Sequence, residues 1–223
     1  MNQKKFTLRN CLEEYLPFIL LVLVTLIVYV VLVQQPDKYP HTSMTFVLWL
    51  AGLIPPLFFT IFGIKFPVFL KCVYYVFIFL AIEVANVFNV FSLWPDWDTW
   101  LHGASGPVVL LFAYYLLLLT GVVKKGNMNL PMLLVLLFFI SVGFSLMWEI
   151  IEMATDVFVD SNSQHNIEEG VFDTMQDILI NAIGTLISLL LVCVDNLFNK
   201  SRGLNGLSKL LLQYSPLKES FSN

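Results

Sequence analysis

Six long apolar runs, separated by short polar segments, follow one another along the chain. Each holds about 20 residues or more, the length that a helix needs to cross a bilayer core of roughly 30 Å. We therefore predict an all-α, polytopic membrane helical bundle with six transmembrane helices in a single domain over 1–198. The predicted spans are about 15–33, 43–64, 66–91, 98–122, 130–158 and 171–198.

The composition favours the same class of protein. Of the 223 residues, 58% are hydrophobic and only 13% are charged, whereas about a quarter are charged in a soluble domain. The basic segment 1–9 is followed by no small-residue cleavage site, so we expect an uncleaved first span. In the tail, 199–223, several leucines share a helical face, which favours a helix lying in the membrane interface.

Basic residues are distributed unequally between the two ends of the predicted spans. Eleven of the twelve Lys and Arg residues lie on the side that holds both termini, and the opposite side has Lys38 alone. By the positive-inside rule both termini are cytoplasmic. The sequence therefore predicts a multi-pass protein of a cytoplasmic membrane with its N- and C-termini inside.

Polar residues recur along the fifth and sixth predicted spans at steps of three and four. Residues at these steps share one face of a helix, and a polar face points toward protein or water rather than lipid. We expect the two spans to pack against each other along these faces. The residues are Ser141, Ser145, Glu149, Glu152 and Asp156 in the fifth span, and Asp173, Asp177, Asn181, Gly184 and Ser188 in the sixth.

The fourth span opens on Asp98 and His102, which lie one helical turn apart and can touch. In the predicted topology this end of span four meets the end of span five and the start of span six at the outer leaflet. No basic side chain is placed there. Ionisable groups that share so small a volume cannot all be charged and dry, so some are protonated, hydrated or bound to a cation.

We therefore expect an outward-facing acidic site and consider a divalent cation, Zn, Mn or Mg, as its cofactor. An imidazole with carboxylates suits Zn or Mn, and carboxylates alone suit Mg. The alternative is a structural network in which Asp98 orients His102 and the other acids form hydrogen bonds. The candidate metal ligands are His102, Asp98, Glu149, Glu152, Asp173 and Asp177. The candidate catalytic residues are Asp98, His102, Glu149 and Asp177, supported by the polar residues Glu83, Asn86 and Asn181.

Three classes of function remain open at this point. A metal-assisted or acid–base envelope enzyme would act on a lipid-linked phosphate or amide at the outer leaflet. A small cation- or proton-coupled transporter would also use buried acids, but the inner halves of spans four and five are nearly free of polar groups. A non-catalytic structural or resistance-related protein would bind a partner through the acidic mouth. Membrane lipids surround the protein in each case, and the net charge of −4 with no basic patch disfavours nucleic-acid binding.

The order of these polar motifs resembles that of the VanZ-like and YjdF-like bacterial membrane proteins. The resemblance rests on Asp98-x-x-x-His102, Glu149-x-x-Glu152 and Asp173-x-x-x-Asp177-x-x-x-Asn181-x-x-Gly184, and it covers about 98–188. Glu152 stands where VanZ-like proteins tend to have Gln, and the arginine that they often carry before the last acidic helix is missing, so the pattern is nearer to the YjdF-like one. The resemblance implies a bacterial cytoplasmic membrane and a shared architecture. It implies no settled activity, although VanZ-like proteins are linked to glycopeptide resistance.

Overall fold

The computed structural model describes residues 8–94, 96–120, 129–159, 171–199, 207 and 211, and these residues form helices and no strand. The all-α class is therefore confirmed. The elements are α1 (Leu8–Leu32), α2 (Met44–Gly52), α3 (Ile54–Phe62), α4 (Val68–Ile78), the π-helix η1 (Phe79–Val87), α5 (Val90–Leu93), α6 (Trp97–Leu119), α7 (Leu130–Val159) and α8 (Val171–Asn199).

Six stretches of the described residues are long and apolar enough to cross a membrane, which confirms the predicted number of spans. They are Leu8–Leu32, Met44–Phe62, Val68–Val87, Trp97–Leu119, Leu130–Phe158 and Val171–Asp195. The first helix begins at Leu8, ahead of the predicted start near residue 15. The interfacial helix predicted in the tail lies outside the described residues, apart from positions 207 and 211.

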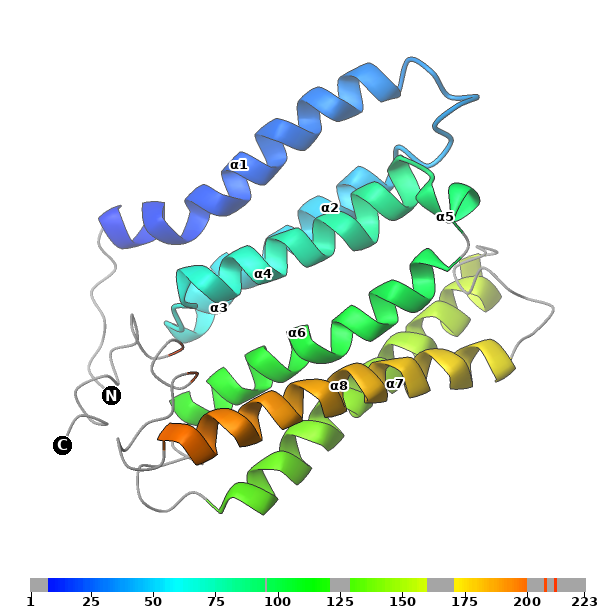
Figure 1. Ribbon diagram of the computed structural model, residues 1–223. Helices are drawn as coiled ribbons and strands as arrows, with labels where there is room; N and C mark the ends of the chain where they lie inside the picture. The colour runs from blue at the N-terminus through cyan, green and yellow to red at the C-terminus, as the bar shows by residue number, and fades with distance from the viewer. Residues whose placement is uncertain are drawn as a thin grey trace. The chain divides into compact units, whose positions relative to one another are not determined.

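The chain divides into two compact units, residues 1–97 and 98–223. In the first unit, α1 and α4 run in the same direction, and α2 and α3 run in the opposite direction (Figure 1). In the second unit, α6 and α8 run in the same direction and α7 runs against them (Figure 1). In each unit the reversal follows from the short connections between successive spans.

The Pro55–Pro56 pair breaks the second span into α2 and α3. Proline has no backbone N–H, so the carbonyl groups of Ala51 and Gly52, four residues earlier, lose their helical donors. Two tyrosines on α4 replace those donors. The Tyr74 hydroxyl donates to the Ala51 carbonyl oxygen at 2.7 Å, and the Tyr75 hydroxyl donates to the Gly52 carbonyl oxygen at 3.0 Å. The break is thus also a polar junction between α2 and α4.

Helix α1 is joined to the rest of the first unit by polar contacts at two levels. Near its start, the Lys71 ammonium group donates to Glu14 Oε2 at 3.1 Å, and both side chains are buried. Further toward the C-terminal end of α1, the Thr25 hydroxyl accepts a hydrogen bond from the Trp49 indole N–H at 2.8 Å. In a hydrocarbon environment such groups need partners within the protein, so these pairs fix the register of α1 against α2 and α4.

The third span changes from α-helix to π-helix at Phe79, and the amide of Phe88 donates to the Glu83 carbonyl oxygen five residues back. Asn89 then adopts a left-handed backbone with φ +57°, a conformation that asparagine tolerates better than most residues. Within this stretch the Glu83 carboxyl is fully buried and accepts a hydrogen bond from the Thr45 hydroxyl.

In the second unit α7 packs along α8. The hydroxyls of Ser141 and Thr185 lie 2.8 Å apart, and the Ser141 hydroxyl also reaches the Gly106 carbonyl oxygen of α6 at 3.2 Å. The prediction that the fifth and sixth spans pack polar face against polar face is therefore confirmed. The three helices are held together by hydroxyl groups at the level of Ser141.

We predict that Tyr74→Phe destabilises the first unit, because the Ala51 carbonyl loses its only side-chain donor among the described residues. A carbonyl left without a partner costs about 1–3 kcal/mol. Thermal unfolding in detergent will show a lower midpoint, and adding Pro55→Ala will restore most of it by returning a backbone N–H. Tyr29→Phe, which removes a hydroxyl from a tyrosine packed on Phe46, is the control. Equal midpoints for Tyr74→Phe and Tyr29→Phe would contradict this account of the proline break.

Candidate functional site

Helices α6 and α8 begin at the end of the second unit where α7 finishes (Figure 1). Asp98 lies in the first turn of α6, and Asp173 lies in the first turn of α8. The N-terminus of a helix carries partial positive charge and favours a carboxylate by about 0.3–1 kcal/mol. Two helix starts therefore hold acids at this end, and the last turns of α7 add Glu149 and Glu152.

His102 lies at the centre of this end of the unit and is only 6% exposed. Its Nδ1 atom lies 3.5 Å from Glu149 Oε1 on α7. Its Nε2 atom lies 3.7 Å from Asp98 Oδ1 on α6 and 3.9 Å from Asp177 Oδ2 on α8. One imidazole thus meets a carboxylate from each of the three helices, and both of its nitrogens face acid.

A neutral imidazole cannot satisfy this arrangement by itself, because it has one N–H and one lone pair. If Nδ1 donates its hydrogen to Glu149, the lone pair of Nε2 points toward two carboxylates. An electron pair facing two anions is unfavourable unless a positive charge stands between them. The geometry therefore needs a second proton on the ring, a protonated carboxyl group that donates to Nε2, or a cation beside Nε2.

The carboxylates repel one another in the same way. The ligand atoms of Asp98, His102 and Asp177 all lie within 4.8 Å of one another. At that separation two unit charges repel by about 3.5 kcal/mol at an effective dielectric constant of about 20. Asp177 and Glu149 are each 4% exposed, so water screens them little. A bound cation would convert this repulsion into attraction.

Three buried polar atoms in the same region have no hydrogen-bond partner among the described residues. They are Glu149 Oε1, Asn181 Oδ1 and Ser145 Oγ, on side chains that are 5% exposed or less. A buried polar atom without a partner costs about 1–3 kcal/mol, so native proteins rarely keep one without a reason such as a bound ion or water. These atoms come from α7 and α8, and they mark where a small polar ligand would be bound.

A column of hydrogen-bonded groups supports the cluster from within the unit. The Ser105 hydroxyl donates to the His102 carbonyl oxygen at 2.7 Å and accepts from the Asn181 amide at 2.7 Å. Below it, Ser141 and Thr185 bond to each other. The column therefore links α6 to α8 and α7 to α8 and orients the carboxamide of Asn181.

Close contact between α6 and α8 depends on glycine. A Cβ atom at Gly184 would overlap the carbonyl oxygen of Gly103, and a Cβ atom at Gly106 would lie 2.6 Å from the Asn181 carbonyl oxygen. Real Cβ atoms do not make such contacts, so both positions require glycine for the backbones to approach this closely. This approach brings Asp177 within reach of His102.

Most of the residues predicted from the sequence as site residues come together in the second unit. Two overlapping sets have the spacing of metal ligands, Asp98, His102 and Asp177 in one and His102, Glu149 and Glu152 in the other. Asn181 lies directly below them and contacts Ser105. Asp173 is half-buried at the start of α8 and belongs to neither set.

The remaining two predicted residues, Glu83 and Asn86, belong to the first unit and have contacts there. Glu83 bonds to Thr45, and the Asn86 amide donates to the Ala81 carbonyl oxygen at 3.3 Å. The first contact joins α2 to η1, and the second lies within η1.

Sequence reasoning overlooked Thr185, which is fully buried and bonded to Ser141. Its signal was present, because Thr185 continues the series Asp173, Asp177 and Asn181 by one more step of four. Threonine is easily overlooked in an apolar helix, since its hydroxyl can bond to its own backbone.

The chain matches one known protein family along most of its length. A family model described as "Predicted membrane protein (DUF2238)" matches residues 16–196. The chain belongs to this family. The match reaches into all six candidate spans, whereas the resemblance to VanZ-like and YjdF-like proteins was limited to the last three. A VanZ-like or YjdF-like identity does not follow from membership of DUF2238. No curated protein and no solved structure matches the chain.

We predict that Gly184→Ala weakens the second unit of this DUF2238 protein, because the added methyl group forces α8 away from α6. Overpacking of this kind costs about 1–3 kcal/mol. Gly143→Ala is the matched control, since a Cβ at Gly143 meets nothing within 4 Å, and alanine is the better helix former by about 0.5–1 kcal/mol. In detergent, thermal unfolding of Gly184→Ala will begin at a lower temperature than that of the wild type, and Gly143→Ala will match or exceed the wild type. Similar midpoints for the two variants would contradict the close packing of α6 on α8.

Proposed function

We propose that this DUF2238 protein binds one divalent cation through Asp98, His102 and Asp177 and uses it to act on a lipid-linked substrate. The observation that carries the proposal is the imidazole with carboxylates at both ring nitrogens. In this assignment Nε2 is the metal ligand, and Glu149 Oε1, 3.5 Å from Nδ1, would accept the Nδ1–H after a small approach. A carboxylate that holds the second nitrogen of a ligating histidine fixes its tautomer and orientation, as in many metal sites.

The distances support a metal of small radius. In a tetrahedral site with metal–ligand bonds of about 2.0–2.1 Å, two donor atoms stand about 3.3 Å apart. The Nε2 atom of His102 lies 3.7 Å from Asp98 Oδ1 and 3.9 Å from Asp177 Oδ2, so each of these two pairs is within about half an ångström of the tetrahedral spacing. The imidazole favours Zn or Mn over Mg, which prefers oxygen ligands. Glu152, which belongs to the overlapping set with His102 and Glu149, is a candidate for an additional carboxylate ligand.

Three protein ligands leave a coordination position for water, which is the arrangement of a catalytic rather than a structural site. A divalent cation held by these residues would lower the pKa of a bound water toward neutral and so supply a nucleophile for a phosphoryl or acyl group. The unpartnered oxygens of Ser145 and Asn181 offer additional hydrogen-bonding positions for water or substrate. A lipid-linked phosphate or amide is therefore the substrate class that we propose.

The position of the site along its helices favours a substrate that resides in the membrane. The cluster lies within one or two turns of the start of α6 and α8, where a span meets the headgroup region. Trp100 and Trp148 flank it and are 64% and 52% exposed, as expected of aromatic residues at that boundary. With the distribution of Lys and Arg, we propose that the site faces outward from a bacterial cytoplasmic membrane, with both termini inside.

A transporter is the second candidate, and the polar column disfavours it. The column descends to Ser141 and Thr185, and from there α7 continues with apolar side chains from Leu130 to Ile140. A pathway for ions through the membrane needs polar groups or water along its whole length. A one-sided site suits binding or catalysis at one face of the membrane.

The shared arrangement of acids also leads us to propose that the likeness to VanZ-like and YjdF-like proteins reflects a common site architecture.

We predict that the protein, purified in mild detergent and dialysed without chelator, retains about one Zn or Mn per chain. His102→Ala and Asp177→Asn will each lose at least nine-tenths of it, since each removes a direct ligand. Asp195→Asn is the matched control, because it makes the same change on the same helix at the opposite end, where Asp195 accepts from the Leu207 amide. Metal analysis by mass spectrometry gives the result. A folded wild type without metal, or variants that keep it, would favour the structural network of protonated acids.

Catalysis is tested by a separate measurement. In proteoliposomes that contain a polyprenyl diphosphate, the wild type with Zn or Mn will release inorganic phosphate, and chelator will stop the release. Glu149→Gln will retain metal but lose activity by roughly a hundredfold, because a misoriented ligand of this kind typically lowers activity 10- to 100-fold. Phosphate release that is equal in wild type and His102→Ala would exclude this chemistry, and metal binding without release would restrict the function to binding.

A further inference from the structure

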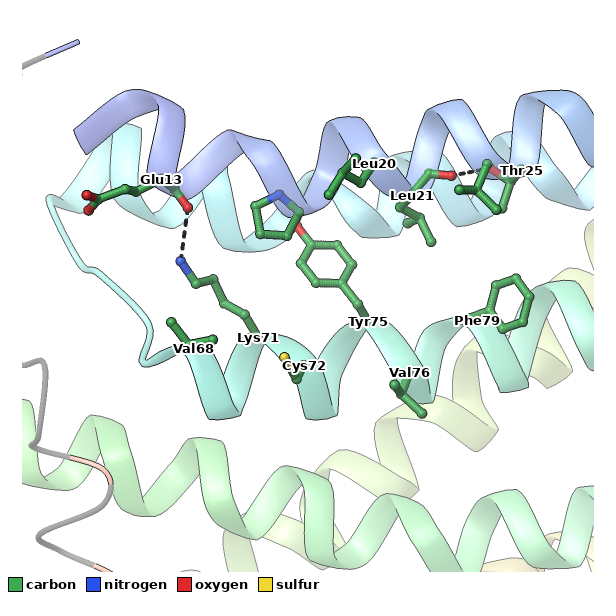
Figure 2. Close-up of a pocket in the computed structure, with 12 residues that line it drawn as sticks. Glu13, Leu20, Leu21, Thr25, Val68, Lys71, Cys72, Tyr75, Val76 and Phe79 are labelled. Atoms are coloured by element: carbon green, nitrogen blue, oxygen red, sulfur yellow. Dashed lines mark hydrogen bonds between the residues drawn. The ribbon is translucent and has the colours of Figure 1, made fainter. Parts of the chain in front are cut away.

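An apolar groove lies in the first unit between α1 and the segment formed by α4 and η1 (Figure 2). Its volume is about 430 Å³, within the range of about 300–1,000 Å³ for pockets that hold a small molecule. Side chains of both segments face it, among them Leu20 and Val24 from α1 and Cys72 and Val76 from α4. These four side chains are exposed, so the groove is open to the surroundings of the unit.

The groove has one polar end and one apolar end. At the polar end the Lys71 ammonium group donates to the Glu13 carbonyl oxygen (Figure 2). It also donates to Glu14 Oε2, so two of its three N–H groups are used. Arg9 and Lys65 reach the same end through their contacts with Glu13, at 2.9 Å and 3.9 Å. Three cations against two carboxylates leave an excess of one positive charge there.

The length of the groove matches one leaflet of a bilayer. On α4 and η1 the lining runs from Val68 to Phe79, eleven residues further along, or about 17 Å at 1.5 Å per residue. Half of a hydrocarbon core of roughly 30 Å is about 15 Å. A groove that starts at the basic end of two candidate spans therefore extends to about the middle of the membrane.

We propose that this groove binds one acyl chain of an anionic glycerophospholipid, whose phosphate lies at the end formed by Arg9, Lys65 and Lys71. A groove on a membrane-spanning unit is surrounded by lipid tails, so its natural occupant is apolar and flexible. The excess positive charge selects an anionic headgroup, since each Lys or Arg at a membrane surface contributes about fivefold to the binding of an acidic lipid. The leaflet is the one on the side of the N-terminus.

A helix from a second protein is a poorer occupant on grounds of size. A helix segment 17 Å long and about 10 Å in diameter takes up about 1,300 Å³, roughly three times the volume of the groove. An extended acyl chain is narrower and needs no hydrogen-bond partners. Lipid in the groove would also cover the buried Lys71–Glu14 pair on its open side.

The test uses the full chain, delipidated in detergent and titrated with phosphatidylglycerol or phosphatidylcholine, with bound lipid counted by native mass spectrometry. We expect one phosphatidylglycerol to remain bound to the wild type and to bind at least fivefold more tightly than phosphatidylcholine. Val24→Trp fills the groove and will weaken binding at least tenfold. Leu23→Trp is the matched control, because Leu23 directly precedes Val24 on α1, is 52% exposed against 57% for Val24, and does not line the groove.

Lys65→Gln tests the headgroup separately, since this lysine is 17% exposed and lies outside the buried Lys71–Glu14 pair. It will reduce the preference for phosphatidylglycerol over phosphatidylcholine about fivefold. The proposal is overturned if no lipid remains bound, if the two tryptophan variants bind equally, or if both headgroups bind alike. A wild type that is free of lipid but dimeric would instead show that a second copy covers the groove.

Discussion

The second unit is organised by one electrostatic constraint, an imidazole that has carboxylates at both of its ring nitrogens. His102 meets Asp98, Glu149 and Asp177, one acid from each helix, at 3.5 to 3.9 Å. Such a group is stable only when a proton, on the ring or on a facing carboxyl group, or a metal ion lies between the imidazole and the acids. The glycines at 106 and 184 serve this arrangement, because they let α8 approach α6 closely enough to bring Asp177 to the ring.

The two units treat buried polar groups differently. In the first unit, each buried side-chain polar atom of residues 8–94, which the structure describes, has a hydrogen-bond partner, and Trp97 Nε1 at the boundary with the second unit lacks one. Even the carbonyl groups freed by Pro55 and Pro56 accept tyrosine hydroxyls. In the second unit Ser145, Glu149 and Asn181 keep buried atoms without a partner. Because unpaired polar groups are most costly away from water, the contrast points to a ligand in the second unit and to a structural role for the polar groups of the first.

The features that could be predicted from the sequence are those that repeat with the period of a helix. Runs of apolar residues predicted the six candidate spans, and steps of three and four predicted that α7 and α8 meet along Ser141 and its neighbours. The same spacing singled out Asp98 and His102. The helical period identifies the face of a helix on which a residue lies. When polar faces occur at the ends of successive spans that lie on the same side of the membrane, their side chains can be expected to form a cluster.

Features that depend on contacts distant in the sequence could not be predicted in this way. Nothing in the local sequence pairs Lys71 with Glu14, 57 residues away, or Tyr74 with the carbonyl group freed by Pro55. The π-helical stretch over Phe79–Val87 could not be predicted from the sequence, since its polar residues Glu83 and Asn86 are equally compatible with an α-helix. The groove between α1 and α4 depends on the spacing of two helices, which no periodicity encodes. These features depend on tertiary packing, which brings together residues that are distant in the sequence.

X-ray absorption at the metal edge distinguishes a metal bound by His102 Nε2 and carboxylate oxygens, as we propose, from one bound elsewhere. In protein loaded with one equivalent of Zn or Mn, we expect a first shell that contains a single imidazole nitrogen and several oxygens at about 2.0–2.2 Å. The signature of the imidazole ring will disappear in His102→Gln, while Asp195→Asn will leave the spectrum unchanged. A first shell of oxygen alone in the wild type, or one that contains sulfur, would contradict the assignment of His102 as the metal ligand.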